Sequence, residues 1–199
     1  MTTSTEETIR AQLSETARNL EAMAADRKLV FEVDRVVSAC VAALRNGYKV
    51  LFAGNGGSAA DAQHLAGELV SRFAYDRPGL PAFALTTDTS VLTAIGNDYG
   101  YERVFARQIE GLARRGDVLM AFSTSGNSPN VVQAAQAARR LGCTVVAFTG
   151  ARGGELAGHA DVLLKAPSST VARIQEVHTL CIHVLCESLD ALLRAEQAS

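Results

Sequence analysis

The chain has 199 residues and a formal net charge of −2, with 48% hydrophobic and 20% charged residues. These values are typical of a globular protein and exclude an intrinsically disordered chain. The sequence has no basic block interleaved with aromatic residues, which argues against a nucleic-acid or membrane surface.

The four cysteines form no CxxC pair, and the N-terminal stretch MTTSTEETIRAQL is polar where a signal peptide would be apolar. No apolar run reaches the roughly 18 residues of a membrane span. The sequence therefore predicts a soluble protein of the reducing cytoplasm.

Two helices are predicted before the first strand. In residues 4–26 the apolar residues fall near one stripe, and Ser4 with Glu7 has the spacing of a capping box. Residues 28–47 form the second helix, closed by Asn46-Gly47. We expect residues 1–46 to be a helical extension in an oligomer interface, with packing on the flank of its own domain as the alternative.

From residue 48 onward, short apolar runs alternate with helical segments. The runs are 49–54, 82–85, 117–123, 144–150 and 161–166, and the helices are 58–74, 89–113, 129–141 and 170–195. This alternation predicts a parallel sheet covered on both faces, and nearly continuous apolar runs such as VLMAF fit strands buried on both sides. The predicted class is α/β, with a three-layer, doubly wound, five-stranded parallel sheet that binds ligands at the carboxyl ends of its strands.

The loop after the first predicted strand is one candidate phosphate site. Residues 54–58, GNGGS, run from the strand directly into a helix. Glycines allow a close approach of the backbone, and a helix N-terminus offers free N–H groups and a positive dipole end. The alternative is a tight turn in which Ser58 is the N-cap.

The loop after the third predicted strand, STSGNSPN over residues 123–130, is the second candidate. Ser128 before Pro129 is a good N-cap and first-turn pair. A cap uses one side chain, so the hydroxyls of Ser123, Thr124 and Ser125 favour phosphate binding. The loop contains no Lys or Arg, so such a site would depend on hydroxyls, N–H groups and the helix dipole.

The predicted helix 58–74 carries Asp61, His64 and Glu68 at spacings of three and four residues, which puts all three on one face. A His and a Glu four residues apart can supply two ligands to one zinc ion. The alternatives are a solvated face and an ordinary contact between a histidine and a carboxylate.

The last predicted helix could supply further ligands, because Gln175, Glu176, His178 and His183 interrupt an otherwise apolar segment. Buried polar groups need partners. Helical geometry alone would pair Glu176 with His183, whereas Gln175 and His183 lie about 12 Å apart along an ideal helix axis, near the limit for two ligands of one ion. Periodicity does not choose between these residues.

Four stretches together resemble one family. GNGGSAADAQHLAGEL, TTDTSVLTAIGNDYG, GDVLMAFSTSGNSPNV and ARIQEVHTLCIHVLCE occur in this order and are similar to motifs of the phosphoheptose isomerases, which belong to the SIS (sugar isomerase) fold family. The N-terminal helices resemble the family in length and type only. The resemblance implies a single SIS domain over residues 1–199 and a homotetramer, with residues 1–46 in its core and active sites at subunit interfaces.

The resemblance also implies an activity, a cofactor and a set of site residues. The reaction would be the isomerisation of sedoheptulose 7-phosphate to D-glycero-D-manno-heptose 7-phosphate, the first step towards nucleotide-activated heptose for products such as lipopolysaccharide. The partner would be this small sugar phosphate, with no nucleic acid and no membrane.

One Zn²⁺ per subunit is implied, with the ligands His64, Glu68, Gln175 and His183. The implied substrate contacts are Asn55, Gly56, Gly57, Ser58, Glu68, Asn97, Asp98, Ser123, Thr124, Ser125, Ser128 and Gln175. Some relatives carry Asp where this chain has Ala172.

For that reaction, one proton must move between carbons 1 and 2 and another between their oxygens. Zinc could polarise the carbonyl oxygen through an enediol(ate) mechanism. The candidate catalytic residues are Glu68 for the carbon-bound proton, His183 for the other face or the oxygens, and Asp61 as the group that orients His64.

Two other protein classes share the fold. One is a regulator that binds the replication initiator protein and typically lacks part of the metal and acid–base set. The other is a sugar-phosphate-sensing domain, which usually accompanies a second domain. Because the complete set is present here, the sequence favours the enzyme.

Overall fold

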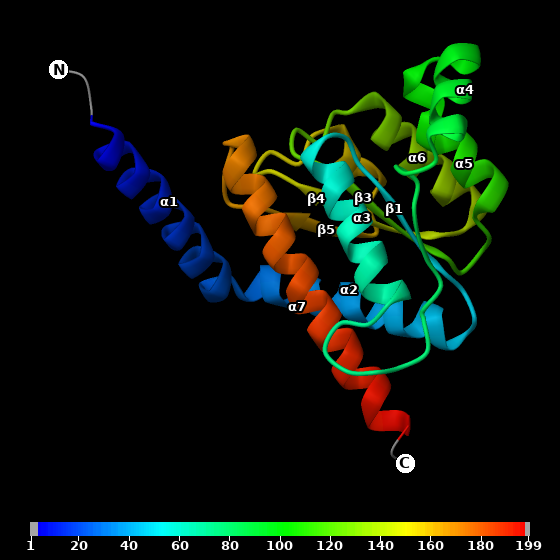
Figure 1. Cartoon of the computed structure of the whole chain (residues 1–199), viewed down its shortest axis with the longest axis horizontal. Helices are drawn as coiled ribbons and strands as arrows, with labels where there is room; N and C mark the ends of the chain where they lie inside the picture. The colour runs from blue at the N-terminus through cyan, green and yellow to red at the C-terminus, as the bar shows by residue number, and fades with distance from the viewer. Residues whose placement is uncertain (1–3, 198–199) are drawn as a thin grey trace.

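The computed structural model describes residues 4–197 of the chain. At its centre lies a five-stranded parallel sheet in the order β2-β1-β3-β4-β5 (Figure 1). The strands are β1 (Val50–Ala53), β2 (Ala82–Ala84), β3 (Val118–Ser123), β4 (Thr144–Thr149) and β5 (Val162–Lys165). All five predicted strands are therefore confirmed, as is the doubly wound α/β class.

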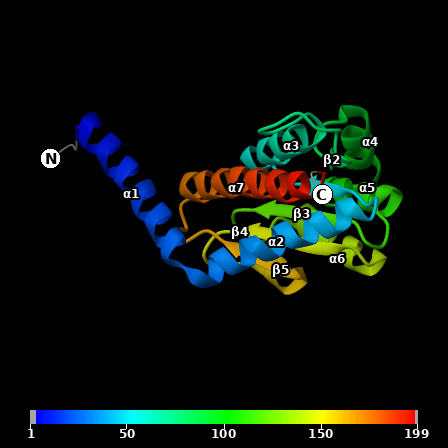
Figure 2. The same cartoon turned by 90° about the horizontal axis from the view of Figure 1, so that it is seen from below.

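Helices cover both faces of the sheet (Figure 2). They are α1 (Thr5–Ala25), α2 (Arg27–Arg45), α3 (Gly57–Val70), α4 (Thr89–Tyr99), α5 (Val104–Leu112), α6 (Pro129–Leu141) and α7 (Val171–Gln197), with the short 3-10 helices η1 (Tyr101–Arg103) and η2 (Glu155–His159). One face packs against α2, α3 and α7, and the other against α5 and α6. Within residues 4–197 no helix combines the length and the apolar character needed to cross a bilayer.

The central strands contribute to both halves of the core because successive side chains point to opposite faces of the sheet. Phe52 and Phe122 pack on the side of α2, α3 and α7. Leu51 and Ala121, their neighbours along β1 and β3, pack on the side of α5 and α6. This two-sided burial is the reason that the strands are continuous apolar runs in the sequence.

Helix α1 extends away from the rest of the molecule in both views (Figures 1 and 2). The predicted capping box is formed, with hydrogen bonds in both directions between Ser4 and Glu7. Met23, near the C-terminal end of α1, is buried, whereas Ile9 is 52% and Leu13 67% exposed. The apolar stripe of α1 therefore packs on its own domain only near the C-terminal end of the helix.

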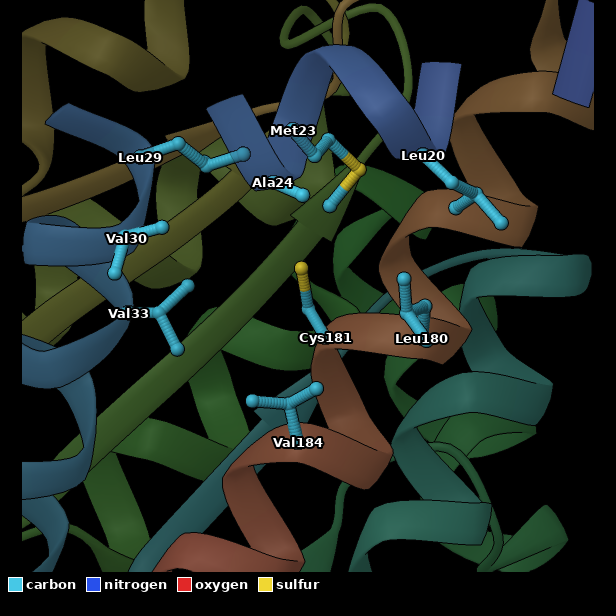
Figure 3. A pocket seen from close by; sticks show the side chains of 9 residues that line it. All are labelled: Leu20, Met23, Ala24, Leu29, Val30, Val33, Leu180, Cys181 and Val184. Atoms are coloured by element: carbon cyan, nitrogen blue, oxygen red, sulfur yellow. The ribbon is translucent and has the colours of Figure 1, made fainter. Parts of the chain in front are cut away.

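The end of α1, together with α2 and α7, borders an apolar groove of about 240 Å³ (Figure 3). Figure 3 shows aliphatic and sulfur-containing side chains from the three helices facing the same space. The residues that line it are Leu20, Met23, Ala24, Leu29, Val30, Val33, Leu180, Cys181 and Val184. The exposed apolar residues of the projecting helix α1 and this apolar groove thus belong to the same end of the molecule.

Two predicted helix boundaries differ from the structure. The predicted helix 89–113 is interrupted at Gly100, whose φ of 87° is a left-handed conformation that favours glycine, so α4 and α5 are separate helices. Helix α3 ends at Val70 instead of residue 74, and the guanidinium of Arg77 donates hydrogen bonds to the carbonyl oxygens of Glu68 and Leu69 in the last turn, which have no partner further along the helix.

The strand order creates a switch point between β1 and β3. From β1 the chain continues to β2 on one side, and from β3 it continues to β4 on the other. Open α/β sheets bind ligands outside the carboxyl ends of their strands at such a point. The two loops that the sequence identifies as candidate phosphate sites follow these two strands.

Candidate active site

The loop after β1 contains a glycine turn that starts α3. Gly56 has a φ of 55° and is the N-cap, and it forms no side-chain capping bond. Ser58 is buried as the second residue of α3, so the alternative in which Ser58 is the N-cap is wrong. The first N–H groups of α3 are thus left without the side-chain cap that would compete with an anion.

Helices α3 and α7 lie side by side (Figure 1). They run in the same direction, because successive residues of α3 contact successive residues of α7 at a nearly constant separation along the chain. The amide of Gln175 lies over Gly57, so closely that a Cβ at Gly57 would overlap it. One turn further along both helices, the hydroxyl of Thr179 donates a hydrogen bond to Oδ1 of Asp61 at 2.8 Å. The face of α3 that the sequence identifies therefore meets the polar side of α7.

The next turn brings three predicted metal ligands together. Nε2 of His64 lies 3.1 Å from Oε1 of Glu68, and the rings of His64 and His183 meet edge to face with their centroids 5.1 Å apart. Phe73 stacks on His183 with the ring centroids 6.2 Å apart. The side chains of His64 and Glu68 are 39% and 25% exposed, so a ligand can reach them.

Asp61 is buried beside this group and is only partly satisfied. Its Oδ1 accepts the hydrogen bond from Thr179, whereas its Oδ2 has no hydrogen-bond partner among the described residues. Burial raises the pKa of Asp61, and the Thr179 hydrogen bond and the charge of His64 oppose that increase. Asp61 thus keeps one buried carboxylate oxygen that can still accept a hydrogen bond.

The loop after β3 gathers three hydroxyl groups. The Oγ of Ser123 lies 3.0 Å from that of Ser128 and 3.5 Å from that of Ser125. Ser128 occupies the N-cap position of α6, as predicted, but its hydroxyl contacts Ser123 and forms no capping bond. The hydroxyl that the sequence would assign to a cap is thus available to a ligand together with the other two.

A cation lies next to this loop although the loop has none of its own. Arg152, in the connection after β4, lines a small polar cavity with Thr124 and Ser168. The backbone N–H of Gly150 donates to the carbonyl oxygen of Thr124 at 3.0 Å, which holds the two connections together. Sequence reasoning confined to residues 123–130 could not find this guanidinium.

Asn97 and Asp98 lie on the exposed last turns of α4, where the Asn97 amide donates to Asp98 at 2.8 Å. The following 3-10 helix η1 brings this segment to the loop after β1, because the hydroxyl of Tyr101 donates to Oδ1 of Asn55 at 3.2 Å. This hydrogen bond joins η1, the segment that follows α4, to the predicted substrate contact Asn55 at the switch point.

Two polar residues of α7 lie outside the candidate site. Glu176 accepts hydrogen bonds from Thr16 of α1 and from Arg173, so the geometric pairing of Glu176 with His183 is wrong. His178 is buried against Phe122 and Phe148. Its Nε2 lies 3.2 Å from the carbonyl oxygen of Thr149, and burial lowers its pKa to about 4.

The side chains gathered here carry the kinds of ligand atom that bind a divalent metal ion. His64, Glu68 and His183 provide two imidazoles and a carboxylate at one place, and the unpaired Oδ2 of Asp61 would stabilise positive charge beside them. Within residues 4–197 no three His, Cys, Asp or Glu side chains form a preassembled metal cluster. The structure thus brings three of the predicted ligands into one region, and Gln175 lies about two turns earlier on α7, against Gly57.

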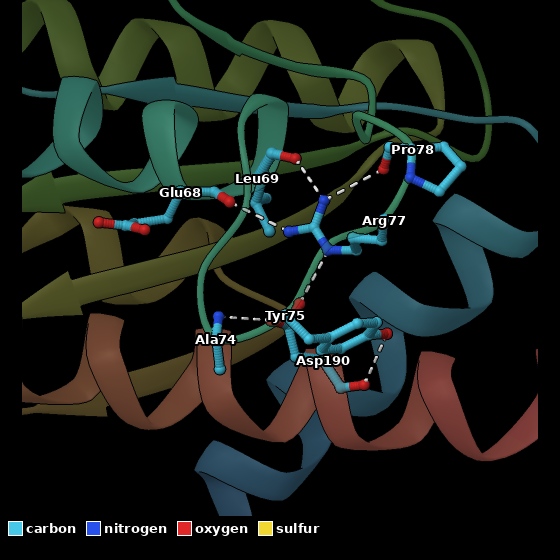
Figure 4. A network of polar contacts seen from close by, with 7 residues as sticks. All are labelled: Glu68, Leu69, Ala74, Tyr75, Arg77, Pro78 and Asp190. Atoms are coloured by element: carbon cyan, nitrogen blue, oxygen red, sulfur yellow. Dashed lines mark hydrogen bonds and ion pairs between the residues drawn. The ribbon is translucent and has the colours of Figure 1, made fainter.

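A buried polar network holds the end of the helix that carries Glu68 (Figure 4). The Arg77 guanidinium pairs with Asp190 of α7 at 2.9 Å and donates to the backbone carbonyl oxygens of Glu68 and Leu69. Asp190 also accepts from the backbone N–H of Ala74. We call this the Arg77–Asp190 clamp, and it ties the end of α3 to α7.

Comparisons with known proteins identify the family. A profile of the SIS domain family matches residues 12–150. A phosphoheptose isomerase of Burkholderia pseudomallei (strain 1710b) is 57% identical over 174 residues, which cover 87% of this chain and 88% of that protein. The chain belongs to the phosphoheptose isomerase family of SIS-domain proteins.

Solved structures of phosphoheptose isomerases agree with this family assignment. That of Neisseria gonorrhoeae superposes with a TM-score of 0.89 at 44% identity, covering 94% of this chain and all of that one. That of Francisella tularensis gives a TM-score of 0.91 at 36% identity and covers 95% of this chain and 100% of that one. The chain is therefore an enzyme, a sugar-phosphate isomerase of heptose biosynthesis with the SIS fold.

Several residues of this phosphoheptose isomerase site were not identified from the sequence. Thr179 could have been found, because it lies four residues after Gln175 and four before His183, on the same side of α7. Asn130 and Arg77 gave no comparable signal, since their partners are 75 and 113 residues away in the chain.

Proposed function

We propose that the chain interconverts sedoheptulose 7-phosphate and D-glycero-D-manno-heptose 7-phosphate. The observation that carries this proposal is the convergence of His64, Glu68 and His183 between α3 and α7. An aldose–ketose isomerase needs groups that accept and return protons at two adjacent carbons and their oxygens, and a carboxylate beside two imidazoles has this capacity.

The phosphate is assigned to the loop after β3. The clustered hydroxyls of Ser123, Ser125 and Ser128 can donate to phosphate oxygens, and α6 begins at this loop with the positive end of its dipole. The carbonyl and the phosphate lie at opposite ends of a seven-carbon sugar phosphate. The proposal therefore uses separate segments for the two ends, with the phosphate loop at the start of α6 and the proton-transfer groups on α3 and α7.

One Zn²⁺ per subunit is assigned to His64, Glu68, Gln175 and His183, whose nitrogen and oxygen atoms suit this ion. Zinc bound there would supply a Lewis acid for the carbonyl oxygen of the sugar. Asp61, whose Oδ2 is unpaired among the described residues, would orient His64 and offset the positive charge of the bound ion.

Glu68 is assigned the carbon-bound proton. Its carboxylate removes a proton from carbon 1 of the ketose, and the same proton returns to carbon 2, so one C–H bond breaks and one forms. His183 moves the hydroxyl proton from the oxygen on carbon 1 to the oxygen on carbon 2. Bonds and electrons balance within the sugar, and no oxidant or reductant is needed.

We also propose that the chain assembles as a homotetramer with residues 1–46 in the interface. The support for this proposal is the projecting α1 with exposed Ile9 and Leu13, and the apolar groove beside it (Figure 3). Apolar surfaces of this kind mark interaction sites. A second copy of the chain is the occupant we assign, because each copy carries both the projecting helix and the groove.

The test is incubation of the purified protein with sedoheptulose 7-phosphate, with and without chelator, followed by chromatographic detection of aldoheptose phosphate. We expect conversion that chelation reduces and added Zn²⁺ restores. No conversion with zinc present would refute the substrate assignment, and conversion indifferent to chelation would refute the role of the metal.

Two variants test the assigned roles. Glu68→Gln and His183→Ala should each lower kcat by at least about a hundredfold, the order that positioned acid–base groups contribute, while the circular dichroism spectrum stays unchanged. His159→Ala is the matched control, because this histidine contacts Gln136 of α6 and lies away from the site. Near-normal turnover by either site variant would exclude its assigned role.

A further inference from the structure

The amide of Asn55 is fixed by a reciprocal pair of hydrogen bonds. Its Nδ2 donates to Oδ1 of Asn130 at 2.8 Å, and Nδ2 of Asn130 donates back to Oδ1 of Asn55 at 2.8 Å. The hydroxyl of Tyr101 donates to the same Oδ1 of Asn55 at 3.2 Å. Asn130 is 3% exposed, so its half of the pair is sheltered from water.

These bonds determine what Asn55 can still offer to a ligand. An amide oxygen has two lone pairs, and Asn130 and Tyr101 occupy both. The amide nitrogen has two N–H groups, and Asn130 takes one of them. One N–H donor remains, so Asn55 can meet an acceptor atom such as a hydroxyl oxygen but has no free lone pair for a donor.

The three residues come from the three segments that border the switch point. Asn55 follows β1, Asn130 lies in the first turn of α6, two residues after Ser128, and Tyr101 begins η1, three residues after Asp98. The bonds at Asn55 thus join the loop after β1 to the hydroxyl-rich loop and to the end of α4. A shift of any one segment would rotate or release the amide.

We propose that Asn130 and Tyr101 are positioning residues that hold the Asn55 amide so that its remaining N–H donates to a hydroxyl oxygen of the sugar phosphate. This inference rests on the proposed function, in which Asn55 contacts the sugar. Neither Asn130 nor Tyr101 needs to touch the substrate, since both act through the orientation of one side chain.

A double-mutant cycle separates this role from a general effect on the fold. Asn55→Ala and Asn130→Ala should each raise the KM and the calorimetric Kd for sedoheptulose 7-phosphate about fivefold to tenfold, the range expected for loss of one hydrogen bond of about 1 kcal/mol or slightly more. The kcat should change by less than about twofold, because the lost contact serves binding in the ground state and in the transition state alike. The double variant should be no more than about twofold weaker than Asn55→Ala, because Asn130 then has no amide to position.

Tyr101→Phe is the second variant, since Tyr101 is 61% exposed and loss of its hydroxyl leaves the core intact. It should raise KM and Kd about twofold to fivefold, and this effect should also vanish in the Asn55→Ala background. Arg139→Ala, on an exposed position near the C-terminal end of α6, is the matched control and should change both constants by less than about twofold.

The outcomes distinguish this inference from the proposed function. Multiplicative losses in the double variants, or unchanged binding in Asn130→Ala and Tyr101→Phe, would overturn the positioning role. Binding of sedoheptulose 7-phosphate without turnover would overturn the proposed reaction. The double-mutant cycle, measured through the Kd of each variant, would still decide the role of Asn130. If the wild-type protein did not bind this sugar phosphate, both would be overturned.

Discussion

Gly57 is the residue at which the backbone of α3 makes its closest approach to a predicted ligand. A Cβ at this position would overlap the amide of Gln175, whereas Gly67 on the same helix has open space in the direction of a Cβ. A methyl group would therefore displace the Gln175 amide at Gly57 and nothing at Gly67, although both glycines are helical and solvent-exposed.

We predict that Gly57→Ala lowers kcat/KM about tenfold to a hundredfold, because a displacement of the order of 1 Å at a reacting group can cost this much. Gly67→Ala is the matched control. It should keep its activity and gain up to about 1 kcal/mol in free energy of unfolding, since alanine favours the helix. Steady-state kinetics and chemical denaturation measure both effects, and wild-type kinetics in Gly57→Ala would show that the Gln175 amide can move without loss.

His178 is the residue that should make stability depend on pH. Burial lowers its pKa to about 4, against 6.5 in an unfolded chain, so the unfolded state binds more protons between these two values. The free energy of unfolding should therefore fall as pH decreases from about 6.5 towards 4, by up to about 3 kcal/mol. Asp61 opposes this trend, because its raised pKa makes the folded state bind protons more readily.

Urea denaturation at pH 7 and pH 5, at one protein concentration, measures this dependence. His178→Gln can keep a donor to the carbonyl oxygen of Thr149 and removes the titratable ring. The difference in free energy between the two pH values should shrink in this variant. An equal pH dependence in wild type and His178→Gln would assign the effect to other groups.

Among the elements, the end of α3 depends on the Arg77–Asp190 clamp (Figure 4). The two side chains are 2% and 4% exposed, so water cannot replace either partner. Arg77→Ala would leave the Asp190 carboxylate buried without its ion pair and free the Glu68 carbonyl oxygen. We predict a loss of about 3–5 kcal/mol in free energy of unfolding, the usual cost of an uncompensated buried charge.

The double variant Arg77→Met with Asp190→Leu removes both charges and should be more stable than Arg77→Ala. Arg10→Ala serves as a surface control, because its pairing with Glu6 is 76% exposed on both sides and should contribute less than about 1 kcal/mol. Denaturation curves for the three variants provide the comparison. A cost for Arg77→Ala no larger than that of Arg10→Ala would show that the clamp does not stabilise the fold.

At this scale the sequence predicted most of the elements, because their signals are local. The capping box at Ser4, the stop at Gly47 and the continuous apolar strands each depend on neighbouring residues, and the structure confirms them. The break at Gly100 was missed, because a glycine between two helical patterns did not by itself indicate a left-handed turn.

The candidate site was predictable only in part for the same reason. Helical spacing put His64 and Glu68 on one face, and the structure confirms their contact at 3.1 Å. Spacing could not determine which residues of α7 face α3, since that depends on how two helices about 118 residues apart pack side by side. The amide pair of Asn55 and Asn130 likewise depends on the sheet order and leaves no local pattern.

For the whole molecule, the exposed half of α1 has consequences for assembly. Ile9 and Leu13 continue the stripe that includes Met23, but they extend beyond the surface that their own domain can cover. Ala11 is also exposed but lies two residues from Leu13, about 200° around the helix. The apolar side and the opposite side of α1 can therefore be changed independently.

If residues 1–46 form the interface of a homotetramer, the double variant Ile9→Lys and Leu13→Lys should dissociate into smaller species, because each lysine would place a charge in an apolar contact. Ala11→Lys should remain tetrameric. Light scattering coupled to size-exclusion chromatography, at micromolar concentration, gives the molar mass of each. Dissociation should also lower turnover if active sites lie between subunits. A monomeric wild-type protein would refute the tetramer, and a double variant that stays tetrameric would place the contact outside α1.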